Sequence, residues 1–129
     1  ILIVNVTTGQ SSTYMTLSGV ESAGESGLID ITLDPDFEQN GHFYLYYTPN
    51  TNRISRFTHE ENQGGLTSTA SQSSEEIVWE NSGRASNGHQ GGGLDFGPDG
   101  SIPSCPRWAR GEVLASRSCL FSSDHGPCH

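Results

Sequence analysis

The sequence predicts an all-β fold made of short strands and tight turns. Only 32% of the 129 residues are hydrophobic, whereas 16 of the 129 are glycine. That composition is typical of many short strands joined by turns, and not of a helical bundle. Alternating or β-branched runs recur along the chain, separated by Gly, Pro, Asn and Asp. The length corresponds to about one domain, and no stretch is apolar for long enough to span a membrane.

The predicted strands follow one another in the first eighty residues. Residues 1–6 and 13–17 are expected to pair as a hairpin, with turn residues at 9–12. Four further strands are expected at residues 27–33, 42–48, 52–58 and 75–79. The first of these four is apolar at most positions, which predicts burial in the core. The third alternates, which predicts one face open to solvent.

Turn signals separate these strands. Asp34-Pro35-Asp36 and Asn40-Gly41 are expected turns, because proline fixes φ, aspartate bonds its own backbone and glycine accepts a positive φ. Residues 60–74 are polar and rich in glycine and serine, which predicts a surface excursion.

An apolar strand followed by an x-Pro-Asp turn occurs twice, at Leu28–Asp36 and at Leu94–Gly100, with the prolines 63 residues apart (98 minus 35). Repeated antiparallel units of this kind predict a β-propeller, whose blades are four-stranded sheets. The usual period is about 40–50 residues, so residues 60–74 are expected to be an insertion. An incomplete propeller has open sheet edges, which are available to pair with another chain.

The pattern ends after Ser101. Prolines at positions 103 and 106 interrupt the strand that should follow the turn, and all three cysteines (Cys105, Cys119 and Cys128) lie beyond it. We therefore expect residues 1–100 to be the propeller-like part and residues 101–129 to be an irregular tail that is not native to the domain. Charge also divides them: three Arg against thirteen acids give −10 in the first part, and three Arg against two acids give +1 in the second.

Charge and cysteine content exclude several classes of function. The net charge is −9 and every cationic side chain is an arginine, so nucleic acid is not an expected partner. The cysteines, His125 and His129 lack the close paired spacing of zinc sites, and no metal ligands are predicted. No signal peptide is visible in the sequence.

His89 is the first candidate for chemistry, because glycines flank it in Gly88-His89-Gln90-Gly91-Gly92-Gly93. Glycine allows positive φ angles and close approach of another molecule, so the imidazole is expected on a loop at the mouth of a β scaffold. The alternative is a loop histidine that bonds only a carbonyl group. For His42 and His59, a satisfied or exposed histidine is expected instead of a ligand.

Two further groups have a functional and a structural interpretation. Tyr44, Tyr46 and Tyr47 have the chemistry to stack on a sugar, but tyrosines at strand spacing favour core packing. Asp34 and Asp36 are interpreted as solvated turn residues, with a calcium contact as the alternative.

Several motifs in the first hundred residues occur in an order that resembles one known family. They are Gly24-Glu25-Ser26-Gly27-Leu28-Ile29, Leu33-Asp34-Pro35-Asp36-Phe37, Asn40-Gly41-His42-Phe43-Tyr44-Leu45-Tyr46-Tyr47, Arg53-Ile54-Ser55-Arg56-Phe57, and His89 with Gly91-Gly92 and Phe96-Gly97-Pro98-Asp99-Gly100. From about Glu21 to Gly100 the chain resembles the start of a soluble quinoprotein glucose/sorbosone dehydrogenase domain.

The resemblance implies a six-bladed propeller, of which this chain supplies about one to two blades. It further implies oxidation of aldose sugars, pyrroloquinoline quinone (PQQ) and calcium as cofactors, and a periplasmic or extracellular location. His89 matches the general base that removes the proton of the anomeric hydroxyl group while hydride passes to the quinone. Glu25 matches a polar position that lines the pocket for sugar and cofactor. Asn87 and Gln90, which flank the base, are expected to add hydrogen bonds to the cofactor.

The resemblance also implies a limit. In this family the cations that hold the quinone's carboxylates, and the calcium ligands, come from later blades than those matched here. The chain is therefore expected to be inactive as an isolated fragment. The alternative is a non-enzymatic propeller fragment that binds a protein or carbohydrate, as related domains of Hedgehog-interacting proteins are thought to do.

Overall fold

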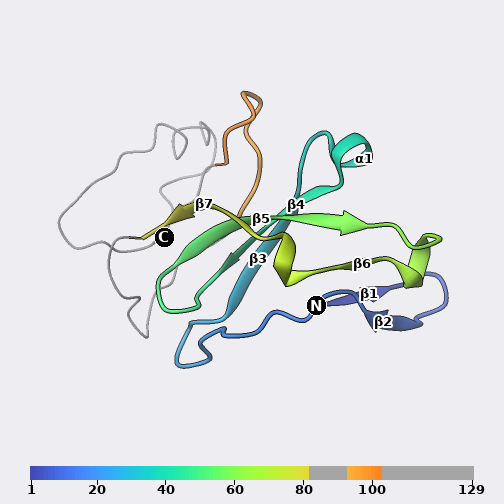
Figure 1. Cartoon of the computed structure of the whole chain (residues 1–129), viewed down its shortest axis with the longest axis horizontal. Helices are drawn as coiled ribbons and strands as arrows, with labels where there is room; N and C mark the ends of the chain where they lie inside the picture. The colour runs from blue at the N-terminus through green and yellow to red at the C-terminus, as the bar shows by residue number, and fades with distance from the viewer. Residues whose placement is uncertain (82–92, 103–129) are drawn as a thin grey trace, which may run out of the picture.

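The computed structural model, which describes residues 1–81 and 93–102, is organised around an antiparallel meander of four strands (Figure 1). These strands are β3 (Leu28–Leu33), β4 (His42–Tyr47), β5 (Arg53–Glu60) and β7 (Glu76–Glu80). β3 pairs with β4, β4 with β5, and β5 with β7. A four-stranded meander is one propeller blade, so the fold is an incomplete β-propeller, as predicted.

A two-stranded hairpin of β1 (Leu2–Val4) and β2 (Ser11–Thr13) precedes the blade. The hairpin is confirmed, but its second strand begins earlier than predicted, and the connection spans residues 5–10, so the predicted turn at 9–12 overlaps it only at residues 9 and 10. Asn5 closes the turn instead, because its Oδ1 accepts hydrogen bonds from the N–H groups of Thr7 and Thr8, each at 3.0 Å. Residues after Thr13 then leave the hairpin and cross the blade, where Met15 is buried.

The connection from β3 to β4 contains a short helix, α1 (Phe37–Asn40). Asp34 organises it: Oδ1 accepts hydrogen bonds from the Asp36 N–H at 2.9 Å and from Asn40 Nδ2 at 3.0 Å, and Oδ2 accepts one from the Tyr44 hydroxyl at 3.0 Å. These hydrogen bonds lower the pKa of Asp34, and the bond from Asn40 has the largest effect. Gly41 ends the helix with φ of 66°, a conformation that favours glycine. Both predicted turns are thus present.

The strand β4 is buried on both faces. Phe43, Leu45 and Tyr47 pack on one face with Met15 and Phe57. On the other face, a second cluster contains Tyr44, Tyr46, Ile54 and Leu94. The tyrosines are therefore core residues, and the alternative of a sugar-stacking surface is wrong for Tyr46 and Tyr47, which are fully buried.

Two predictions about strand burial are wrong. The strand β3 was expected in the core, yet Leu28, Ile31 and Leu33 are exposed, Leu33 to 53%. The residues after β2 cover the central strands and leave this edge strand without a described neighbour on that face. Conversely, β5 was expected to have one wet face, but Ile54 and Ser55, which point to opposite faces, are both buried.

The excursion between β5 and β7 is confirmed. It contains two 3-10 turns, η1 (Gly65–Thr67) and η2 (Gln72–Ser74), and the short strand β6 (Thr69–Ala70), which pairs with the end of β5. Its inner side holds the N-terminal segment: Ala70 N donates to Tyr14 O at 3.0 Å, and Ser18 Oγ donates to Gln72 Oε1 at 2.8 Å. Among the described residues no helix is long and apolar enough to cross a bilayer.

Candidate functional site

The loop that carries Glu25 lies at the same end of the blade as Asn81, the last described residue before the segment that contains His89. Thr48, which follows β4, donates its N–H to Gly27 O at 2.9 Å and accepts the Glu21 N–H at 2.8 Å. Asn52, which precedes β5, accepts the Asn81 N–H at 2.9 Å. The start of β3, the turn between β4 and β5 and the end of β7 therefore meet at this end, which we call the loop end of the blade.

Glu25 is exposed in the connection just before β3, at the loop end. The Ser26 N–H donates to Ala23 O at 3.1 Å, which closes a turn around it. Asn87, His89 and Gln90 lie outside the described residues, between Asn81 and Gly93. The structure thus shows where the chain that carries the candidate base leaves the blade, at the same end as Glu25.

The chain returns to the blade at Leu94, which contacts β3 and the core. The Leu94 N–H donates to Asp30 Oδ2 at 2.6 Å, and the Leu94 side chain, 5% exposed, packs with Tyr44, Tyr46 and Ile54. Asp30 lies in β3, 64 residues earlier, so the contact joins two distant segments. A carboxylate that accepts a backbone N–H makes a strong hydrogen bond.

Sequence reasoning missed this role of Asp30. The signal was present, because Asp30 is the one charged residue in the mostly apolar strand β3. An acid at such a position is costly unless it has a partner. The identity of the partner, however, depends on a contact that no local pattern reveals.

The two described arginines, Arg53 at the loop end and Arg56 in the middle of β5, are already paired with carboxylates. Arg53 contacts Glu80 at 2.6 Å and Glu75 at 3.4 Å, and Arg56 contacts Glu76 at 2.5 Å. Burial alone would raise the pKa of Glu75, but hydrogen bonds from Tyr47 and Ser55 and the charge of Arg53 outweigh burial and hold that pKa below its ordinary value.

These residues do not fit PQQ, which carries three carboxylates. The described residues contain two arginines and thirteen acids, a side-chain charge of −11, and both arginines are neutralised by glutamates. A tricarboxylate at this end would be repelled by the surrounding charge. Within residues 1–81 and 93–102, no three His, Cys, Asp or Glu side chains group as a possible metal site.

Comparison with known proteins agrees with the fold and with the motifs. The family model for glucose/sorbosone dehydrogenase matches residues 1–104, which extends the similarity to the N-terminal hairpin. No curated protein gives a significant match. Among solved structures, the PQQ-bound form of aldose sugar dehydrogenase from Streptomyces coelicolor is similar, with 28% sequence identity and a TM-score of 0.67.

The alignment with the Streptomyces structure covers 78% of this chain and 29% of that chain. The present chain thus spans less than a third of its length. The family model, in contrast, covers most of the 129 residues. By that match, the chain belongs to the glucose/sorbosone dehydrogenase family.

Proposed function

We propose that this chain is the N-terminal blade of a PQQ-dependent aldose dehydrogenase and that it supplies the general base of the reaction. The observation that carries the proposal is the family match, which runs through the His89 segment to residue 104. The structure adds support, because that segment leaves the blade at the loop end and returns on Asp30.

The proposed role of His89 follows from the chemistry of imidazole. With an ordinary pKa of about 6.5, a histidine is largely unprotonated at neutral pH and accepts a proton from a hydroxyl group. In our proposal His89 takes the proton of the anomeric hydroxyl group, and Glu25, Asn87 and Gln90 contribute polar contacts around the sugar and cofactor.

The cofactors belong to the complete propeller in this proposal. Because the described residues offer no unpaired arginine, we propose that the fragment neither holds the quinone nor turns over by itself. PQQ and calcium would be bound with the later blades, in a periplasmic or extracellular protein. We also propose that residues 1–100 form the propeller part and that, within residues 101–129, the tail foreign to it begins after the family match ends at residue 104.

A chimera tests the enzymatic role. Residues 1–102 replace the matched part of the Streptomyces aldose sugar dehydrogenase, and dye reduction is followed with aldoses after loading with PQQ and calcium. We expect turnover, and His89→Ala should lower kcat by roughly 10²- to 10⁴-fold. His42→Ala is the matched control, because His42 begins β4 at the opposite end of the blade, and its rate should stay within about twofold.

A second function is favoured by the apolar residues that β3 and β7 leave exposed, Leu28, Ile31, Leu33, Ile77 and Val78. Such strands suit a non-enzymatic fragment that binds a protein or carbohydrate. An inactive but folded chimera would favour this role over the enzymatic one. Equal rates for the parent chimera and its His89→Ala variant would remove His89 as the base while leaving the enzyme class intact.

A further inference from the structure

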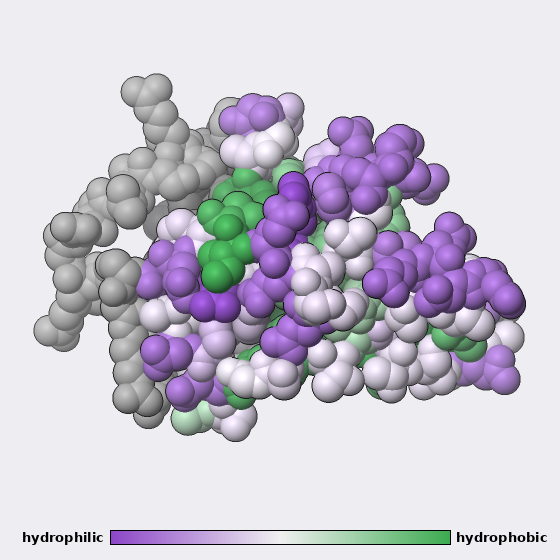
Figure 2. All heavy atoms as spheres, viewed as in Figure 1, coloured by the Kyte–Doolittle hydropathy of each residue, from purple (hydrophilic) through white to green (hydrophobic). Residues whose placement is uncertain are grey.

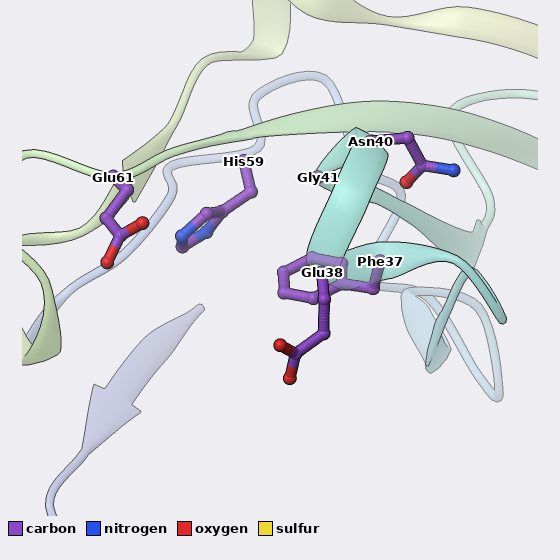
Figure 3. Close-up of a pocket in the computed structure, with 6 residues that line it drawn as sticks. All are labelled: Phe37, Glu38, Asn40, Gly41, His59 and Glu61. Atoms are coloured by element: carbon purple, nitrogen blue, oxygen red, sulfur yellow. The ribbon is translucent and has the colours of Figure 1, made fainter.

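A hollow of about 430 Å³ lies at the end of the blade opposite the loop end (Figure 3). Residues of α1, the glycine that follows it, the end of β5 and the residue after β5 line it: Phe37, Glu38, Asn40, Gly41, His59 and Glu61. None of these residues belongs to the candidate site described above. The hollow therefore calls for an explanation that is independent of the proposed dehydrogenase function.

Aromatic rings form one wall of the hollow and are held in place. The Phe37 and His59 rings are 5.3 Å apart and inclined by 57°, and Tyr14 stacks on His59 from a distance of 5.7 Å. Tyr14 Oη and His59 Nδ1 share a hydrogen bond of 2.8 Å, and the backbone N–H of His59 donates to Gly41 O at 2.7 Å. The two aromatic side chains that line the hollow are thus held in a fixed arrangement.

Two exposed glutamates, Glu38 and Glu61, border the hollow without a compensating charge. Glu38 and Glu61 project from the two sides of the hollow, as Figure 3 shows, and neither has an ion-pair or hydrogen-bond partner in the described part of the chain. In Figure 2, hydrophilic residues cover the surfaces around α1 and around the connection that follows β5, which are the two borders of the hollow.

The polar groups of the hollow select a cation over a neutral sugar. The Asn40 amide is already used, because Nδ2 donates to Asp34 and Oδ1 accepts the His42 N–H at 2.7 Å. The groups that remain are the two carboxylates, which only accept hydrogen bonds, and His59 Nε2, so acceptors outnumber donors, whereas a sugar hydroxyl offers both a donor and an acceptor. A phenylalanine ring such as that of Phe37 attracts ammonium groups through its quadrupole, and nearby carboxylates attract them through charge.

We propose that this hollow binds a small organic ammonium ion, whose methyl or methylene groups rest on Phe37 and His59 while Glu38 and Glu61 neutralise its charge. A bare metal ion is the less suitable occupant, because among the described residues no three potential ligand side chains come together. The side-chain charge of −11 over the described residues further enriches cations near this surface.

The test uses the whole 129-residue chain, labelled with ¹⁵N, and choline as the probe. We expect saturable changes in the NMR shifts of the Gly41 amide and the His59 ring, with a dissociation constant on the order of millimolar. The uncharged isostere 3,3-dimethylbutan-1-ol should bind at least about tenfold more weakly. Raising the salt to about 0.5 M should weaken choline binding, because exposed charges are screened.

Matched variants locate the site. Glu38→Gln and Glu61→Gln should each weaken choline binding by about threefold, in keeping with a partly exposed charge contact. Glu60→Gln makes the same charge change on the neighbouring β5 position, which faces the other way from His59 and does not line the hollow. Its affinity should be unchanged. The proposal is overturned by no saturable shifts with choline, by equal binding of the isostere, by equal effects of all three variants, or by calcium binding more tightly than choline at these residues.

Discussion

Replacing Glu75 with alanine should destabilise the blade strongly, although the residue lies outside every sheet pairing of the central strands. Glu75 Oε1 accepts hydrogen bonds from the Tyr47 hydroxyl and from Ser55 Oγ, the latter at 2.7 Å, and contacts Arg53 Nη1 at 3.4 Å. Ser55 is 0% exposed and Tyr47 is nearly so. The carboxylate is therefore the common acceptor for two hydroxyl groups that water does not reach.

The size of the effect follows from those two hydroxyl groups. Leaving a buried donor unsatisfied costs about 1–3 kcal/mol, so two of them predict a loss of about 3 kcal/mol in the free energy of unfolding. Arg53 keeps its contact with Glu80 and adds little to the loss. With a urea slope of about 2 kcal/mol/M, the midpoint should fall by about 1.5 M.

Urea unfolding, followed by the fluorescence of Trp79 on β7, measures this loss. Glu60→Ala is the control, since Glu60 is exposed and should change the free energy of unfolding by less than about 0.5 kcal/mol. Tyr47→Phe combined with Glu75→Ala should show a coupling above about 1 kcal/mol. A loss no larger than that of the control, or additive effects in the double variant, would refute the shared-acceptor argument.

Three further predictions concern other contacts of the blade. Glu75→Gln keeps an acceptor oxygen but loses the charge. Because the folded-state pKa of Glu75 lies below the ordinary 4.5, the charge of Glu75 stabilises the fold above that pH. The difference in unfolding free energy between the Gln variant and the parent should therefore shrink as the pH falls through the folded-state pKa. Asp30→Ala should speed hydrogen exchange of the Leu94 amide by about tenfold or more, whereas the exposed Asp95→Ala should leave it unchanged. Gly41→Ala should cost about 1–2 kcal/mol, measured by thermal unfolding, since φ is 66° and the new Cβ would lie 3.4 Å from His59 O.

Much of the secondary structure could be predicted from the sequence because its signals are local. The aromatic run at Phe43–Tyr47, the turn at Asp34-Pro35-Asp36 and the Asn-Gly pair before β4 act within a few residues. The excursion at residues 60–74 was predicted for the same reason, since polar and glycine-rich segments rarely form core strands.

The errors came from contacts between distant segments. Leu28, Ile31 and Leu33 look like core residues in the sequence, yet burial requires a neighbour, and the N-terminal segment covers β4 and β5 and not β3. Ser55 looks like a solvent-facing residue of an alternating strand, but the segment around Met15 and the acceptor Glu75 make its burial possible.

The candidate sites divide in the same way. The sequence singles out His89 as a candidate through its flanking glycines, and Glu25 before Gly27-Leu28-Ile29 only through the family resemblance. Asp30 as the anchor of Leu94, and the hollow formed by Phe37 and His59, join residues 64 and 22 positions apart (94 minus 30 and 59 minus 37).

The sequence by itself thus determined the all-β class, the order of the strands, the family motifs and the candidate base, because each depends on short-range periodicity or on a residue type at a given spacing. Only the tertiary structure decided which face of each strand is buried, which acid holds the returning chain, and which carboxylates stay unpaired around an aromatic hollow. Those properties depend on the distance between side chains in space, and chain folding sets that distance independently of their separation in sequence.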